Sequence, residues 1–68
     1  MAEVFGRVLK QLRKEEGLTQ TQLADFCNTT KYTISAWELG KQEPDINTLL
    51  KLSDIFKVSV DYLLGKTH

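Results

Sequence analysis

The chain has 68 residues, enough for one small domain around a single hydrophobic core, and leaves little room for a deep catalytic cavity. Its composition, 41% hydrophobic and 26% charged, excludes a disordered or fibrous protein. Nine basic and nine acidic residues give a formal net charge of zero, which indicates only modest non-specific attraction to polyanions such as nucleic acids.

The first predicted helix covers residues 3–16. Its apolar residues Phe5, Leu9 and Leu12 recur at intervals of three and four, which places them on one face of a helix. Val8 belongs to the same stripe, and polar or charged residues lie elsewhere on the helix, namely Arg7, Lys10, Gln11 and Lys14. Gly17 supplies a stop at the C-terminal end of this helix.

A second helix is predicted at residues 20–26. Thr19 is a good N-cap, and Gln22 stands three residues later in the capping-box position. Asn28 follows where the chain must reverse within a few residues. Because asparagine tolerates a positive φ better than other residues except glycine, we expect the turn there.

The third predicted helix covers residues 30–39, with Thr29 or Thr30 as its N-cap and Gly40 at its end. Two short helices joined by a tight turn are the outline of a helix-turn-helix. An alternative is that the apolar positions belong to the core of any small bundle, but their combined register favours the specific motif. The inward-facing residues are Leu23, Ala24, Cys27, Ile34 and Trp37.

Two further helices complete the chain. Asp45 is a strong N-cap for a helix at residues 46–56, and Ser59 caps a short helix at residues 60–64. Tyr62 and its neighbours either cover the underside of the core or leave an apolar patch for a second copy. No segment reads as a credible strand, so the sequence predicts an all-α fold of five helices.

The sequence resembles a known family, the phage-repressor and Cro-like helix-turn-helix proteins, also called the XRE family. The resemblance runs from residue 5 to residue 65 and implies that residues 1–68 form one DNA-binding domain, a five-helix bundle like that of lambda repressor. Its marks are Leu12-Arg13, Gly17-Leu18-Thr19-Gln20, Gln22-Leu23-Ala24, Ile34-Ser35, Trp37-Glu38, Gly40-Lys41, Pro44, Leu49-Leu50-Lys51-Leu52 and Val58-Ser59-Val60-Asp61-Tyr62-Leu63.

The resemblance implies contacts to the DNA backbone. Gln20, at the start of the second helix, matches a residue that binds a phosphate, and Thr19 can add a hydroxyl contact. Lys41 is placed like a phosphate contact just past the third helix. Leu39 departs from the family, because some relatives carry a polar phosphate ligand at that position.

The resemblance also implies that the third helix enters the major groove. Lys31 suits guanine O6 and N7 or a phosphate, and Tyr32 suits a thymine methyl group or a phosphate. Ala36 is small enough for close approach to a thymine methyl group. The plain alternative for each is an ordinary exposed side chain. The expected leading residues of this helix are Thr30, Lys31, Tyr32 and Thr33, followed by Ala36.

Arg13 and Glu38 resemble the structural ion pair of the family, which links the first helix to the end of the third. Such a pair fixes orientation, because a partly buried guanidinium and carboxylate tolerate few geometries. Trp37 is expected to lie in the core and not to serve as a platform for base stacking, since the rest of its helical turn is expected to pack in the core.

Enzymatic and metal-binding functions lack the necessary residues. Cys27 is the single cysteine and His68 the single histidine, so there is no disulfide, no ligand set for a metal and no nucleophile with a base. No cofactor or small-molecule ligand is expected. No secretory signal and no stretch long enough to span a membrane is visible, which predicts a cytoplasmic protein.

The sequence therefore predicts a regulator of transcription that binds double-stranded DNA, with repression favoured over activation. One module contacts few bases, so a homodimer on a near-palindromic operator is expected, with half-sites about 34 Å apart. The residues fit a phage-type repressor, a restriction-modification controller and an antitoxin equally. The alternative from another class is a protein-interaction module, such as an antitoxin-like partner domain, that has little affinity for DNA.

Overall fold

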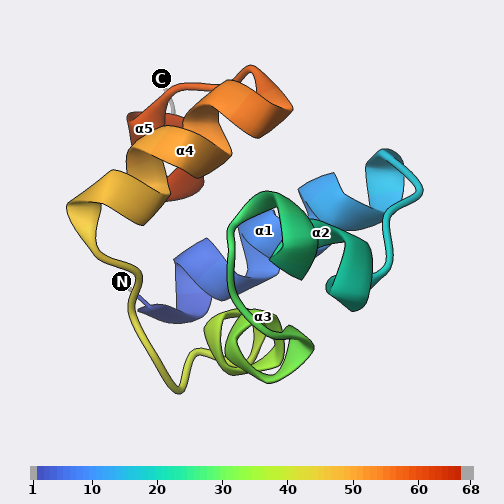
Figure 1. Ribbon diagram of the computed structural model, residues 1–68. Coiled ribbons are helices and arrows are strands. Elements are labelled where there is room, and N and C mark those ends of the chain that lie inside the picture. Colours follow the sequence, from blue (N-terminus) through green and yellow to red (C-terminus); the bar gives the residue numbers. More distant parts are fainter. Residues whose placement is uncertain (1, 67–68) are drawn as a thin grey trace.

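The computed structural model describes residues 2–66, and these residues form helices and turns without any strand. The expectation of an all-α fold with five helices is confirmed (Figure 1). His68, the single histidine considered in the sequence, lies outside the described residues. The helices are α1 (Ala2–Glu15), α2 (Gln20–Phe26), α3 (Lys31–Glu38), α4 (Ile46–Phe56) and α5 (Val60–Leu63).

Helices α2 to α5 each begin at a side chain that caps the first turn. Thr19 and Gln22 form a complete capping box, in which the Thr19 hydroxyl accepts the Gln22 N–H at 3.0 Å and the Gln22 amide oxygen accepts the Thr19 N–H at 2.9 Å. Thr30, and not Thr29, caps α3. Because its backbone is extended, with φ −110°, Thr30 lies outside the helix that was predicted to start there.

The turns after the helices show one expected and one unexpected left-handed residue. Asn28 has φ 54°, as its position between α2 and α3 predicts. Lys57, at the end of α4, has φ 56°, although lysine is not a residue type that predicts a left-handed turn. The Ser53 hydroxyl donates a hydrogen bond to the Val58 carbonyl across this turn, which helps to hold a lysine in a conformation that glycine and asparagine usually adopt.

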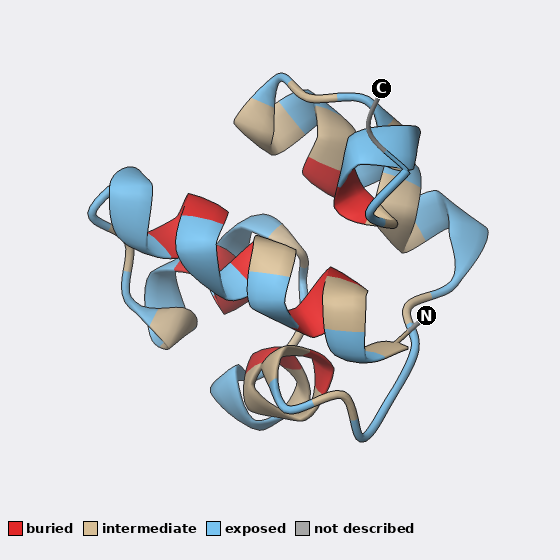
Figure 2. Ribbon diagram, turned by 180° about the vertical axis from the view of Figure 1, so that it is seen from behind, coloured by how far each residue is buried: buried red, intermediate tan, exposed pale blue. Residues whose placement is uncertain are grey.

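Helix α1 runs through the middle of the molecule, with α3 on one side and α4 with α5 on the other (Figure 1). The buried faces of the helices turn toward one another around α1 (Figure 2). Cys27, predicted to face inward, is half-buried against this core. The buried apolar residues are Phe5, Leu9, Leu12, Leu23, Ala24, Ile34, Trp37, Leu52 and Leu63.

The contact between α1 and α3 is unusually close at Gly6. A Cβ atom added to Gly6 would lie 2.5 Å from the Trp37 carbonyl oxygen and 2.6 Å from that of Glu38. Only a residue without a side chain allows the end of α3 to approach this near. This role of Gly6 was not predicted from the sequence.

The helix lengths also bear on membrane insertion. Within residues 2–66, none of the helices combines the length and the hydropathy needed to cross a bilayer.

Candidate nucleic-acid interface

Helices α2 and α3 form a helix-turn-helix that is locked by its apolar side. Leu23 and Ala24 of α2 and Ile34 and Trp37 of α3 are all buried. Ala24 also accepts the N–H of Thr29 through its carbonyl oxygen at 3.0 Å, which closes the turn. The relative position of the two helices is thus fixed by packing and by the turn together.

The N-terminal edge of α3 is open to solvent. Thr30 and Lys31 are exposed, and Tyr32 keeps 74% of its surface accessible. The Lys31 ammonium lies 5.5 Å from the centre of the Tyr32 ring, within the range of a cation–π contact. Thr33 and Ala36 are half-buried. No other segment among residues 2–66 covers Lys31 or Tyr32, so both side chains are available to a partner.

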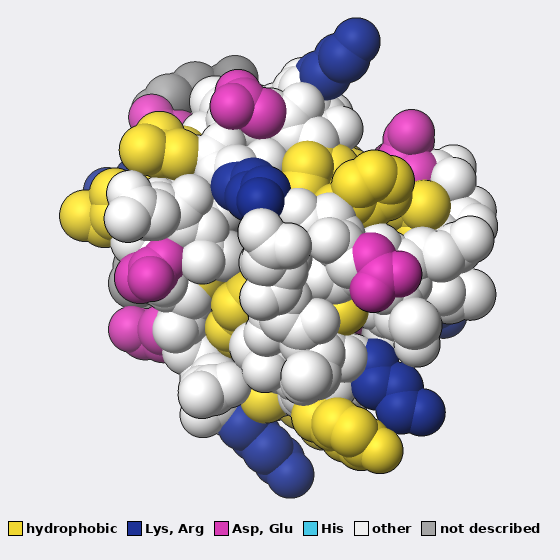
Figure 3. All heavy atoms as spheres, viewed as in Figure 1, with side chains coloured by type: hydrophobic (Ala, Val, Ile, Leu, Met, Phe, Trp, Pro, Cys, Tyr) yellow, Lys and Arg dark blue, Asp and Glu magenta, His cyan; other side chains and the backbone are white. Residues whose placement is uncertain are grey.

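The hydroxyls of Thr30 and Thr33 are engaged locally. The Thr30 oxygen accepts the N–H of Thr33 at 3.4 Å and lies 3.5 Å from the Thr33 hydroxyl. Each hydroxyl retains further hydrogen-bonding capacity, because a hydroxyl oxygen has two lone pairs and one proton. Figure 3 shows basic and hydrophobic side chains at the end of the molecule where α3 lies, with acidic side chains on the other parts of this face.

Arg13 and Glu38 are in direct contact and almost fully buried. Arg13 Nε donates to Glu38 Oε2 at 2.6 Å and Nη2 donates to Oε1 at 3.1 Å, and the two side chains are 11% and 3% exposed. Arg13 Nη1 also donates to the Leu18 carbonyl at 2.9 Å. The guanidinium therefore joins α1 to the end of α3 and to the segment that leads into α2.

Gln20 takes part in the same network. Its Nε2 donates to Glu38 Oε1 at 3.1 Å, so one of its two amide protons is used within the protein. The other amide proton and the amide oxygen have no hydrogen-bond partner recorded among the described residues. The link between Gln20 and Glu38 was not predicted from the sequence, because the two residues are 18 positions apart and no local pattern connects them.

The remaining candidate contacts lie around the two helix ends. Thr19 is exposed, although its hydroxyl caps α2. Lys41 is exposed beyond the C-terminal end of α3, where its N–H donates to the Ala36 carbonyl at 2.9 Å. Lys31 and Lys41 therefore stand at opposite ends of α3, which is about 12 Å long at 1.5 Å per residue. Leu39, the departure from the family, is 64% exposed.

Residues 2–66 contain no group of three or more histidine, cysteine, aspartate or glutamate side chains able to hold a metal ion. Burial raises the pKa of the Cys27 thiol, which keeps it protonated and makes it a poor nucleophile and metal ligand.

The chain belongs to the helix-turn-helix family, whose sequence model matches residues 9–63. It is 46% identical over 96% of its length to the SPbeta prophage-derived HTH-type transcriptional regulator YonR of Bacillus subtilis, and covers 60% of that protein. It spans about half the length of the curated relatives it matches, from 49% to 60% for the first three.

Solved structures share the whole fold. The P22 c2 repressor, in complex with a synthetic operator, superposes with a TM-score of 0.88 at 31% identity, over 94% of this chain and 97% of that one. A transcriptional regulator from Listeria innocua gives a TM-score of 0.88 at 34% identity, over 94% of this chain and 60% of the other. The likeness to the repressor thus extends over nearly all of both chains.

Proposed function

We propose that this protein binds double-stranded DNA sequence-specifically as a transcriptional regulator, most simply as a repressor. The observation that carries the proposal is the uncovered N-terminal edge of α3, which projects Lys31 and Tyr32 from a support held by buried apolar residues and by the Arg13–Glu38 pair. The same fold in the P22 c2 repressor, bound to an operator, supports it.

The side chains divide into two roles. Lys31, Tyr32 and Ala36 contact base edges: Tyr32 and Ala36 are one turn apart on α3, and Lys31 begins the same helix at the end that enters the major groove. Other residues contact phosphates and fix the orientation of the domain on the duplex. The proposed phosphate contacts are Thr19, Gln20, Thr30, Thr33 and Lys41.

We further propose that two copies act together on a near-palindromic operator. Half-sites one helical turn apart are separated by about 34 Å. The longest dimension of the described chain is 31 Å, so two copies fit side by side with one α3 in each half-site. A regulator of this kind acts on the chromosome, which places it in the cytoplasm.

Selection from a pool of random duplexes tests the proposal directly. We expect the recovered sequences to share a motif with two-fold symmetry, because a homodimer reads the same bases twice. A scrambled version of the motif serves as the control and should bind about 1,000-fold more weakly or worse. Equal affinity for both duplexes would remove the claim of sequence specificity.

A protein-interaction module is the second candidate. The zero net charge favours it, as do the exposed Ile46 and Leu50, which lie one turn apart on α4 and are 73% and 54% exposed. By contrast, Leu63 is fully buried, so much of the last helix closes the core. A salt titration separates the candidates: phosphate contacts make DNA affinity fall steeply with added salt, whereas an interaction module binds no duplex even at low salt.

A further inference from the structure

Helix α1 carries an exposed basic ridge outside the helix-turn-helix. Arg7, Lys10 and Lys14 occupy positions i, i+3 and i+7, which lie along one side of a helix. All three residues are exposed, and they are three of the nine basic residues of the chain. Within residues 2–66 the recorded ion pair is Arg13–Glu38, so no member of this α1 basic ridge is engaged in a salt bridge.

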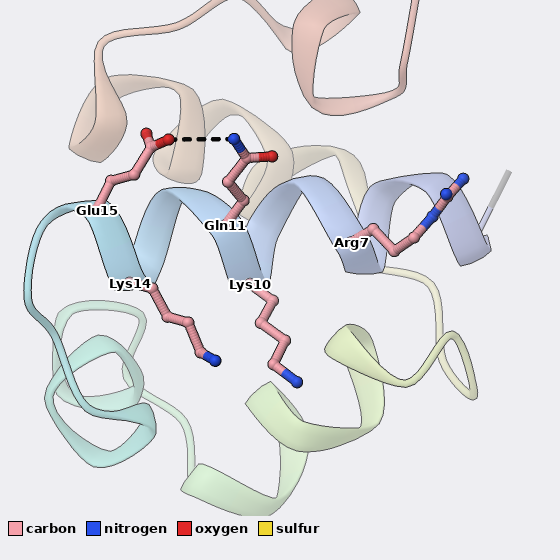
Figure 4. Close-up of a pocket in the computed structure, with 5 residues that line it drawn as sticks. All are labelled: Arg7, Lys10, Gln11, Lys14 and Glu15. Carbon is pink, nitrogen blue, oxygen red and sulfur yellow. Dashed lines mark hydrogen bonds between the residues drawn. The ribbon is translucent and has the colours of Figure 1, made fainter.

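The ridge shares the outer face of α1 with Gln11 and Glu15, and only a shallow, open depression lies between these five side chains (Figure 4). Glu15 is the sole acidic residue of the lining, and its Oε2 accepts a hydrogen bond from Gln11 Nε2 at 3.1 Å. In the close-up, Gln11 and Glu15 point to one side of α1 while Lys10 and Lys14 point to the other. The ammonium groups of Lys10 and Lys14 therefore lie on one side of α1, while Arg7 extends along the helix toward its N-terminal end.

Lys10 and Lys14 point to the side of α1 on which α2 and α3 lie (Figure 4). Lys14 follows Arg13 directly, and Lys10 precedes Arg13 by one turn. Arg13 itself contacts Glu38 of α3, and Glu38 in turn accepts the Gln20 amide at the start of α2. The ridge thus runs beside the network that ends at a proposed phosphate contact.

We propose that the α1 basic ridge binds the sugar–phosphate backbone of the DNA that continues beyond each half-site. This inference rests on the proposed function and adds a second contact surface to it. Arg7 and Lys14 are seven residues apart, which is about 10 Å along the helix axis, so the three cations are close enough together to meet neighbouring phosphates of one strand. A protein with no net charge gains affinity for DNA in this way, because basic side chains that lie along the DNA backbone contribute more to binding than the net charge of the protein does.

The test compares two lengths of the duplex recovered by selection. One ends at the outer edges of the half-sites, and the other continues for about one helical turn on each side, roughly 10 base pairs. We expect the parent protein to show a steeper dependence of log Kd on log salt with the longer duplex. Each phosphate contact adds about 0.9 to that slope, equivalent to about a 3-fold greater loss of affinity between 50 and 200 mM salt.

The decisive variant is R7Q/K10Q/K14Q, which removes the three charges from exposed positions. It should bind both duplexes with the slope that the parent shows for the short one. The matched control is K51Q/K57Q/K66Q, which makes the same change of charge at exposed positions on the α4 and α5 side of the chain. This control should keep the steeper slope of the parent with the longer duplex.

The experiment distinguishes a failure of the α1 basic ridge proposal from a failure of the proposed function. If the ridge variant keeps the steeper slope, or if the control variant loses it as well, the α1 basic ridge does not contact flanking DNA. If the parent binds neither duplex, the proposed function fails, and this inference fails with it. Thermal melts of both variants, compared with that of the parent, establish that any change in slope occurs in folded protein.

Discussion

Glu38 illustrates how much one side chain can organise in a domain of this size. Its two oxygens accept hydrogen bonds from Arg13 Nε, Arg13 Nη2 and the Gln20 amide, and its side chain is 3% exposed. A carboxylate this buried is stable because three donors replace its lost hydration. The same contacts set the position of α3 relative to α1.

We predict that Glu38→Ala lowers the free energy of unfolding by about 3 to 5 kcal/mol, because it leaves the buried Arg13 guanidinium without a compensating carboxylate. Chemical denaturation and thermal melts measure the loss. Glu43→Ala is the control at an exposed position and should change stability by about 0.5 kcal/mol or less. The ranking of DNA sequences should not change. Equal melting temperatures for Glu38→Ala and the parent would contradict the prediction.

Asp45 gives a prediction that depends on pH. Hydrogen bonds from Thr48 lower the pKa of Asp45 below its ordinary value of 3.8, with the Thr48 N–H 2.8 Å from Asp45 Oδ1. Because the folded pKa is lowered, the ionised cap stabilises the fold above pH 3.8, and this contribution disappears as the pH falls through the folded value. The melting temperatures of the parent and Asp45→Ala should therefore converge below pH 3.8, whereas a gap independent of pH would contradict this account.

At the scale of the helices, the approach of α1 to α3 depends on Gly6. We predict that Gly6→Ala destabilises the fold by about 1 to 3 kcal/mol, because its Cβ meets two backbone carbonyl oxygens that cannot rotate away. Alanine favours helix by up to about 1 kcal/mol over glycine, so the contact outweighs propensity. Gln11→Ala, at an exposed position of α1, is the control and should have little effect on unfolding in urea.

The helices themselves were predictable because their start and stop signals are local. Thr19, Asp45 and Ser59 act on backbone groups within three residues, so the sequence around them is sufficient. The close approach at Gly6 and the bond from Gln20 to Glu38 join segments far apart in the chain, and no periodic pattern reports such contacts. Lys57 was missed for a different reason, since lysine does not normally signal a left-handed turn.

At the scale of the whole molecule, the proposed DNA-reading edge and the pair of C-terminal helices lie on opposite sides of α1. The uncovered edge of α3 lies at one end, and α4 with α5 closes the core at the other (Figure 1). The candidate contacts were predictable from the family resemblance, because each depends on its position in one helix-turn-helix. The α1 basic ridge was not, since its three residues read in the sequence as the solvated face of an amphipathic helix.

The division between base and phosphate contacts leads to a final prediction. Lys31→Ala and Tyr32→Ala should alter which duplex is preferred, because base pairs present different groups in the major groove, and each loss should cost about 1 to 3 kcal/mol at the preferred sequence. Gln20→Ala and Lys41→Ala should weaken all duplexes alike, since phosphates are the same in every sequence, and Lys41→Ala should reduce the salt slope by about 1.

Gln20→Ala also removes a hydrogen bond to Glu38, so its affinity must be measured where melts show the variant to be folded. Lys57→Ala, at the end of α4, is the control and should leave both affinity and preference unchanged. Binding of each variant to a panel that contains the selected duplex and its single-base substitutions separates the two effects. A Lys31→Ala variant that ranks the panel as the parent does would show that Lys31 contacts phosphate and reads no base.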